Sequence, residues 1–315
     1  MKRALCAAMP FLLRCIRRGL PVAGPGGYME NGMNEYFILP NGVKLPKIGY
    51  GTFRCTDGSD ERIVRMALEA GYRMLDTAAF YGNEEYIGKG IKESGIPREE
   101  LFLTSKVWKT DLGYEKTMES FHASLKRLQT EYLDLFLIHW PKPEPECENW
   151  KELVAGSWKA MEELYDLGKI RAIGLSNFLP HHIEALMETA RIKPMVDQLE
   201  LHVGYMQEIA VQYCKKQGIQ VQAWSPLGRT RVLEESTVLK MAEKYGVSAA
   251  QFLLRFLLQQ DICVIPKATS MERMRQNLEL PLFDITAEDM YALKCLPQLG
   301  WSGEHPDRER VPAQV

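Results

Sequence analysis

Four side chains that can exchange protons follow strand-like runs at regular intervals. Asp76 ends the run YRMLD, and Tyr81 follows shortly after it. Lys106 lies near the end of LFLTSKVW, and His139 lies near the end of LDLFLIHW. The steps from Asp76 to Lys106 and from Lys106 to His139 are 30 and 33 residues, about one strand plus one helix each. A carboxylate, a phenol, an ammonium and an imidazole brought together suit acid–base chemistry.

Each of these residues has a plainer interpretation when it is taken alone. An Asp after a strand is commonly a helix cap, a Tyr is commonly packing, and a Lys or His at a strand end is commonly solvated. The combination is more informative, because adjacent parallel strands deliver their carboxyl-terminal residues to one face of a sheet or barrel. We therefore expect the four side chains to converge on one pocket.

The elements that would position them alternate along the chain. Eight short β-rich runs, from KIGYG to CVIPK, are each followed by a longer helical pattern. No GxGxxG or GxxxxGK[ST] loop is present, which counts against an open dinucleotide-binding sheet. The pattern predicts an α/β protein with one (β/α)8 TIM barrel over residues 35–315. Asn41-Gly42 between two apolar runs predicts an N-terminal β-hairpin, with positive φ at both residues.

Composition limits the function classes. With 39 basic and 41 acidic residues, the 315-residue chain has no overall field that would attract nucleic acid or an anionic membrane surface. Seven cysteines without paired spacing argue against zinc and for a reducing, cytoplasmic compartment. No segment reaches the apolar length of a membrane helix. These features predict a small-molecule partner and no membrane or nucleic-acid partner.

The first 28 residues do not belong to this pattern. They begin with Lys2 and Arg3 before a short apolar run, but Pro10 interrupts the run and no cleavage site of the secretory kind follows. Met29 and Met33 lie just before the first folded pattern. We expect residues 1–28 to be an extension that is disordered or that results from a start codon assigned too early.

Six blocks together resemble the aldo-keto reductase family in order and spacing: YRMLDTAAFYGNEEYIG, LTSKVW, LFLIHWP, GLSNF, WSPLG and IPKATSMERMRQN. The resemblance covers residues 35–310 and is strongest to the shorter prokaryotic members, such as 2,5-diketo-D-gluconate reductases and general aldehyde reductases. It implies a monomeric, NADPH-dependent enzyme that reduces aldehydes and ketones to alcohols.

The resemblance also implies a role for each of the four residues. Tyr81 would be the proton donor, and Lys106 would supply a positive charge that favours loss of the phenol proton. Asp76 would hold the ammonium in an ion pair. His139 would donate a hydrogen bond to the substrate carbonyl. This chemistry requires no metal ion.

The remaining positions implied by the resemblance bind NADP(H) or the substrate. Trp224, where many relatives have Tyr, would stack on the nicotinamide, and Arg229 would either pair with a phosphate or be solvated. Lys267 and Arg273 would recognise the ribose 2′-phosphate. The full set of cofactor contacts is Gly51, Thr52, Asp76, Ser176, Asn177, Gln198, Trp224, Ser225, Leu227, Arg229, Lys267, Ala268, Thr269, Arg273, Gln276 and Asn277. The substrate contacts are Phe53, Phe80, Trp108, His139 and Trp140.

Two other functions remain open from the sequence. A lyase of the same barrel class would use Lys106 to form a Schiff base with a carbonyl, which requires a neutral lysine. A binding or regulatory module would retain the cofactor without rapid turnover. The C-terminal segment LGWSGEHPDRERVPAQV, with Trp301 and Arg308, resembles the variable closing segment that sets specificity in relatives.

Overall fold

The structure is a computed structural model that describes residues 36–55 and 61–311. The extension predicted at residues 1–28 lies outside the described residues. Within the described part of the chain, no helix is long and apolar enough to cross a membrane.

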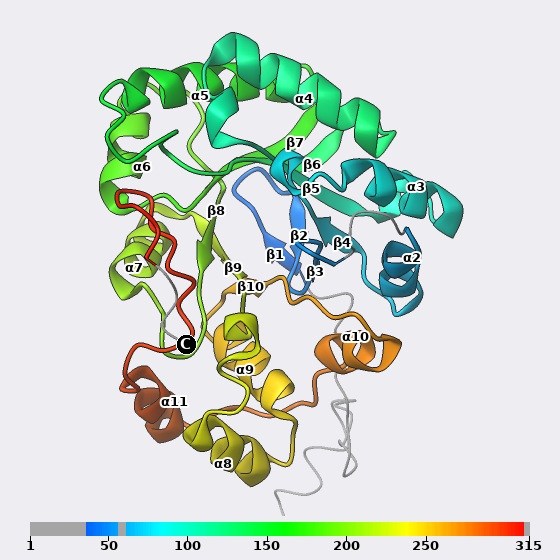
Figure 1. The fold of residues 1–315 in the computed structure, drawn as a ribbon, viewed down its shortest axis with the longest axis vertical. Helices are drawn as coiled ribbons and strands as arrows, with labels where there is room; N and C mark the ends of the chain where they lie inside the picture. The colour runs from blue at the N-terminus through cyan, green and yellow to red at the C-terminus, as the bar shows by residue number, and fades with distance from the viewer. Residues whose placement is uncertain (1–35, 56–60, 312–315) are drawn as a thin grey trace, which may run out of the picture.

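Eight parallel strands form the predicted barrel (Figure 1). Neighbours in the sheet are neighbours in sequence, and the first and last strands meet through a parallel bridge between Ile48 and Val264. The Gly49 amide donates to the Val264 carbonyl at 2.8 Å, which completes the closure. The strands are β3 (Tyr50–Gly51), β4 (Met74–Asp76), β5 (Phe102–Val107), β6 (Leu133–Ile138), β7 (Ile170–Ser176), β8 (Val196–Glu200), β9 (Gln220–Trp224) and β10 (Cys263–Val264). All eight predicted strands are present.

Helices surround the sheet, as Figure 1 shows. Because they cover its outer face and side chains fill its interior, every residue of β5 and β6 is buried. The helices among the described residues are α2 (Arg62–Glu69), α3 (Glu84–Ser94), α4 (Tyr114–Leu128), α5 (Trp150–Asp166), α6 (Pro180–Met187), α7 (Glu208–Gln217), α8 (Ser236–Tyr245), α9 (Ala249–Leu258), α10 (Met271–Leu278) and α11 (Ala287–Lys294).

The closure of the barrel requires a glycine. Gly51 on β3 lies next to the segment that follows β10, and its backbone N–H donates to the Pro266 carbonyl at 3.1 Å. A Cβ atom at this position would lie 2.7 Å from the Ile265 carbonyl oxygen. Only glycine permits this close approach without moving backbone.

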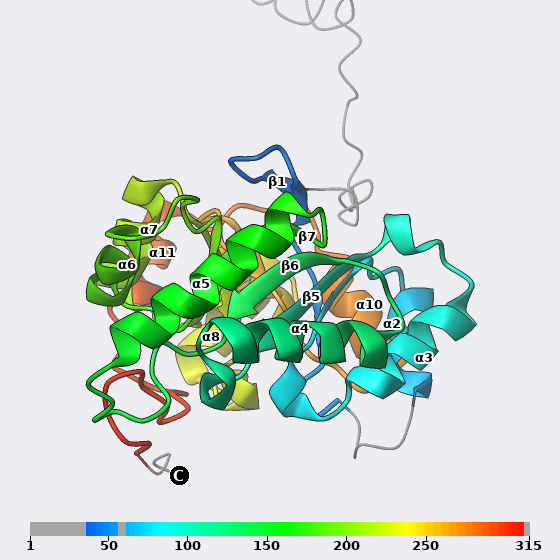
Figure 2. The same ribbon diagram turned by 90° about the horizontal axis from the view of Figure 1, so that it is seen from above.

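The predicted N-terminal hairpin is present as β1 (Tyr36–Ile38) paired with β2 (Lys44–Pro46). The prediction of positive φ at both turn residues is wrong, since only Gly42 (φ +84°) adopts it. The Gly42 amide donates to the Leu39 carbonyl at 2.8 Å, so Asn41 occupies an ordinary turn position. A longer loop that ends in one left-handed glycine replaces the two-residue turn. Figure 2 shows the hairpin and the C-terminal segment at opposite ends of the molecule.

One buried carboxyl outside the barrel lumen lacks a full set of partners. Asp197 on β8 is fully buried, and among the described residues its Oδ1 has no hydrogen-bond partner. Its Oδ2 accepts a weak bond from the Cys214 thiol of α7, at 3.6 Å, and the Phe178 backbone also offsets part of the effect of burial. Burial raises the pKa of Asp197 from 3.8 to about 8, so the neutral acid is favoured at neutral pH.

We expect Asp197→Asn to change how stability depends on pH. Because folding raises the pKa, protonated Asp197 contributes stability that is fully present below pH 3.8 and is lost as the pH rises through about 8. Between about pH 5 and about pH 9, the Tm of the wild type should therefore fall by several degrees relative to that of the variant. Calorimetry across this range measures the difference. The exposed Asp284→Asn variant should follow the wild type, and parallel curves for Asp197→Asn and the wild type would contradict the assignment.

Candidate active site

A cleft of about 870 Å³ opens at the carboxyl-terminal ends of the strands. This is the end of a (β/α)8 barrel where loops build active sites. The sequence-predicted residues that line it are Gly51, Thr52, Phe53, Asp76, Phe80, Tyr81, Trp108, His139, Trp140, Asn177, Gln198, Trp224, Ser225, Leu227, Arg229 and Lys267. Three of the four proton-exchanging residues therefore face one space, and Lys106 lies buried next to them.

Asp76 and Lys106 form a buried ion pair at the floor of the cleft. The Lys106 ammonium donates to Asp76 Oδ1 at 2.6 Å and to the Thr77 carbonyl at 3.0 Å, and both side chains are almost inaccessible to solvent. Asp76 Oδ2 accepts from the Gln198 amide at 2.7 Å. Burial is the largest single effect and works against the charged lysine, but the Asp76 carboxylate and Tyr81 together outweigh it and raise the pKa of Lys106. Lys106 is therefore an ammonium at neutral pH.

Tyr81 lies directly over this ion pair. It ends the short 3-10 helix η2 (Ala79–Tyr81), which follows β4, and the Lys106 ammonium lies 5.2 Å from the centre of its ring. Burial raises the pKa of Tyr81, while the charge of Lys106 lowers it, and burial is the larger effect. The Lys106 charge therefore acts in the expected direction but does not outweigh burial. The phenol consequently holds its proton at neutral pH and can donate it.

His139 is a neutral imidazole enclosed by aromatic rings. Burial, reinforced by the positive charge of Lys106, holds the pKa of His139 well below its usual range. The rings of Phe80, Tyr81 and Trp108 meet it edge-on, with the Trp108 ring centre at 5.0 Å. Among the described residues, the buried Nδ1 has no hydrogen-bond partner. A neutral imidazole can donate a single hydrogen bond into the cleft.

The Asn177 side chain, predicted to hold the cofactor, is bonded to neighbouring groups of the site. Asn177, in the left-handed region at φ +63°, donates to the His139 carbonyl at 3.0 Å and to Ser176 Oγ at 3.1 Å. The Trp224 indole N–H donates to Asn177 Oδ1 at 2.9 Å. Trp224 is thereby fixed in orientation, which a phenylalanine at this position could not achieve in the same way.

The predicted phosphate-binding residues follow β9 and β10. Ser225 and Leu227 line the cleft, and the Arg229 guanidinium lies 5.7 Å from the centre of the Trp224 ring. Lys267 is exposed at the cleft edge, and Arg273 lies in the first turn of α10, where its side chain donates to Thr269 Oγ1 at 3.1 Å. The other predicted contacts, Ser176, Ala268, Thr269, Arg273, Gln276 and Asn277, do not line the cleft, and Asn277 is buried.

An aromatic wall borders the catalytic floor. The Phe80 and Trp108 rings stack with centres 3.8 Å apart, and the Phe53 ring packs against Tyr81 at 4.9 Å. Phe53 and Phe80 are 38% and 51% exposed, so they present apolar surface to the cleft. This arrangement is suited to carbonyl compounds with apolar surface.

The structure adds residues that the sequence pattern did not identify. Arg54, Lys109 and Lys142 line the cleft from the loops after β3, β5 and β6. The C-terminal segment contributes several more, of which only Arg308 had been noted: Glu304, His305, Pro306, Arg308, Glu309 and Arg310. Loop residues of this kind carry no periodic signal, but their position just after predicted barrel strands could have suggested them.

Comparison with known proteins agrees with the fold. Residues 47–296 match the sequence profile described as "Aldo/keto reductase family", and the chain belongs to that family. A "Glyoxal reductase" of Bacillus subtilis (strain 168) is 45% identical over 280 residues, covering 89% of this chain and 99% of the relative. The predicted enzyme class, an aldo-keto reductase, is confirmed.

Two solved structures resemble the fold closely. An aldo-keto reductase from a Medee basin deep-sea metagenome library is 41% identical with a TM-score of 0.78, covering 88% of this chain and 97% of the other. A Bombyx mori aldo-keto reductase in complex with NADP is 34% identical with a TM-score of 0.75, covering 82% and 92%. The predicted TIM barrel is confirmed.

We expect Lys106→Met to lower the free energy of unfolding by about 3 kcal/mol, because it leaves the buried Asp76 carboxylate without its cation. The double variant Lys106→Met/Asp76→Leu should recover part of this loss, since it removes both charges. Urea denaturation measures both. The control is Lys89→Met, which removes an ion pair from a lysine whose side chain is 52% exposed and should lower stability much less than Lys106→Met does. Equal losses in Lys106→Met and Lys89→Met would contradict the role of the ion pair.

Proposed function

We propose that this protein reduces aldehydes and ketones to alcohols with NADPH, and that Tyr81 donates the proton. The observation that carries the proposal is the arrangement at the floor of the cleft. A charged Lys106 held by Asp76 lies beneath a protonated Tyr81, and a neutral His139 faces the same space.

Each residue has a role in the reduction. His139 donates a hydrogen bond that orients the carbonyl oxygen toward Tyr81. The Tyr81 phenol transfers its proton to that oxygen as negative charge develops there, and the Lys106 ammonium stabilises the phenolate that remains. Asp76 keeps the ammonium in place and balances its charge between turnovers. The aromatic wall excludes water from the reacting carbonyl.

The residues around Trp224 suit a nicotinamide. The flat indole is fixed by its bond to Asn177 and borders the cleft beside Gln198, and polar groups of Ser176, Asn177 and Gln198 are available for a carboxamide after exchange of their present bonds. When bound, NADPH supplies the hydride, which no side chain can provide. The structure of the Bombyx mori aldo-keto reductase in complex with NADP supports this assignment for the family.

Preference for NADPH over NADH is assigned to Lys267 and Arg273. They flank the N-terminus of α10, where Ser270 caps the helix and the backbone N–H groups favour an anion. Two cations and a helix terminus suit a 2′-phosphate. We assign Thr269 as a further hydroxyl donor, because Ala268 offers none, and Gln276 and Asn277 as contacts to the adenine.

The lyase alternative is disfavoured by the state of Lys106. A Schiff base requires a neutral amine, whereas Asp76 raises the pKa of Lys106 and the ammonium already donates to two oxygens. The regulatory alternative has no specific observation in its favour. We further propose that residues 35–315 act as a single barrel unit and as a monomer, which size-exclusion chromatography with light scattering can test.

We expect Tyr81→Phe to lower kcat about 10³-fold while the Kd for NADPH stays within about twofold of the wild-type value, because the variant removes the proton donor and little of the cofactor site. Oxidation of NADPH at 340 nm with glyoxal and with an aromatic aldehyde measures turnover. Tyr114→Phe, on α4 and hydrogen-bonded to Glu163, is the control and should retain activity. Tight binding of NADPH by a wild type that reduces no carbonyl would instead favour a regulatory module.

Removing Lys267 and Arg273, the two cations assigned to the 2′-phosphate, should weaken the binding of NADPH but not that of NADH. For Lys267→Met/Arg273→Met, we expect the KM for NADPH to rise about 10- to 100-fold while the KM for NADH changes little. Steady-state kinetics with both cofactors makes the comparison. Lys240→Met is the control, because it removes a positive charge from an exposed position of α8. Equal effects on NADPH and NADH would refute the assignment.

A further inference from the structure

The C-terminal residues 302–310, here called the strap, lie across one side of the cleft. Figure 1 shows this segment, coloured red, beside α6, whose His181 and His182 it contacts. At its start, the buried Glu200 at the end of β8 accepts from the Ser302 amide at 2.9 Å and from Ser302 Oγ at 2.6 Å. This contact fixes the beginning of the strap to the barrel itself.

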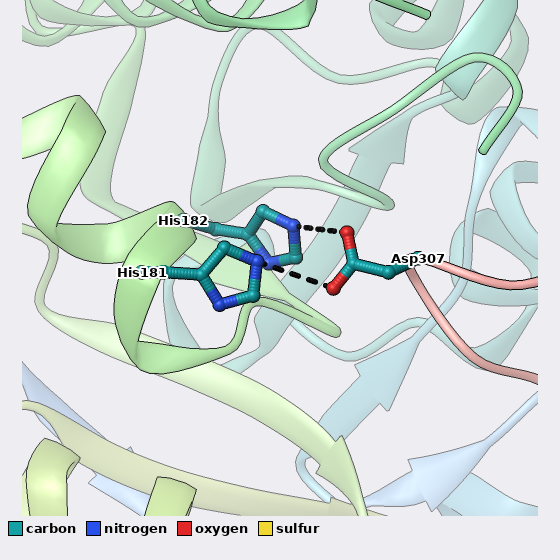
Figure 3. A group of neighbouring side chains, drawn as sticks. All are labelled: His181, His182 and Asp307. Carbon is teal, nitrogen blue, oxygen red and sulfur yellow. Dashed lines mark hydrogen bonds and ion pairs between the residues drawn. The ribbon is translucent and has the colours of Figure 1, made fainter. Parts of the chain in front are cut away.

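The strap is held a second time by Asp307. Its carboxylate meets three groups from two other segments, and Figure 3 shows two of them. The Lys142 ammonium, in the loop after β6, lies 2.6 Å from Oδ1. His182 Nε2 lies 2.9 Å from Oδ1, and His181 Nε2 lies 3.2 Å from Oδ2. Asp307 therefore joins the strap to the β6–α5 loop and to the first turn of α6.

The residues between the two anchors face the site. Glu304, His305 and Pro306 line the cleft, and Glu304 and Pro306 also border a small cavity shared with Trp140 and Trp224. Internal bonds stiffen this stretch. The Trp301 indole donates to the Glu304 carbonyl at 3.1 Å, and the Asp307 amide donates to His305 Nδ1 at 3.1 Å. Movement of Asp307 would therefore move cleft-lining residues.

His181, His182 and Asp307 also have the composition of a metal site, since their ligand atoms lie within 4.8 Å of one another. Two observations disfavour a cation there. The Leu179 amide donates to His182 Nδ1 at 3.1 Å, so in the neutral ring the proton is on Nε2, the nitrogen that faces Asp307. Burial lowers the pKa of His182 to about 4, so at neutral pH the ring carries only this one proton and has no lone pair toward Asp307. The Lys142 ammonium already occupies the cationic position beside the carboxylate.

We propose that Asp307 is a positioning residue that holds the strap over the cleft and thereby sets the affinity for carbonyl substrates that extend beyond the aromatic wall. The inference rests on the proposed reductase function. A two-carbon dicarbonyl reacts at the floor, between Tyr81 and His139, and does not reach the strap. A long aryl aldehyde fills the outer cleft and loses contacts when the strap is released. Neither Asp307 nor Lys142 takes part in the proton transfer.

The experiment compares Asp307→Ala with the wild type on glyoxal and on a long aryl aldehyde. We expect the KM for the aryl aldehyde to rise about 10-fold or more, while kcat for both substrates and the KM for glyoxal stay within about twofold. Asp307→Asn retains an oxygen acceptor for His182 and should lie closer to the wild type. Asp166→Ala is the matched control, because it removes an ion pair of the same 2.6 Å length, with Arg191, outside the cleft.

Limited trypsin cleavage provides a readout that is independent of activity. Release of the strap should accelerate cleavage after Arg308 or Arg310 in Asp307→Ala, but not in Asp166→Ala, with folding of the barrel checked by Tm.

An unchanged KM for the aryl aldehyde would overturn the positioning role even though turnover of glyoxal upholds the reductase function. Zn²⁺ that binds the wild type stoichiometrically, and not Asp307→Ala, would overturn it in favour of a metal site. Absence of turnover with both substrates would instead refute the proposed function, and an unchanged cleavage rate would then refute the strap contact separately.

Discussion

The buried ion pair between Asp76 and Lys106 is the interaction on which the rest of the site depends. Two charges placed in the barrel interior are costly unless they meet at short distance and with additional hydrogen bonds. Here the Thr77 carbonyl and the Gln198 amide supply those bonds. The parallel sheet makes this possible, since β4, β5 and β8 present these side chains at one end of the barrel.

Burial and this charge pair together determine the protonation of the neighbouring side chains. Burial keeps His139 neutral by lowering its pKa, and the positive charge of Lys106 acts in the same direction. Burial keeps the proton on Tyr81, while Lys106 limits the energy needed to release it. The resulting site holds one proton ready for donation and one neutral hydrogen-bond donor beside it. That combination suits a reaction in which negative charge develops on a carbonyl oxygen.

The sequence predicted the barrel and the convergence of the four residues because both follow from local patterns. Buried parallel strands appear as apolar runs in the sequence. Their carboxyl-terminal ends lie at the same end of the barrel, whatever the sequences of the loops. The left-handed turn at Asn41 was predicted wrongly because the loop length was set by pairing of β1 with β2, which the dipeptide alone does not reveal. The strap contact of Asp307 joins residues over 100 positions apart, and the charge state of Asp197 depends on complete burial. Neither leaves a periodic signal.

The most direct test of the account follows a label through the reaction. NADPH carrying deuterium at the transferable position of the ring is incubated with an aldehyde and the wild-type protein, and the product is examined by mass spectrometry and NMR. The account predicts an alcohol with one deuterium on the former carbonyl carbon, formed in step with NADPH oxidation and with its hydroxyl proton from solvent. An alcohol without the label, or a product formed by joining or cleaving carbon bonds, would contradict carbonyl reduction at this site.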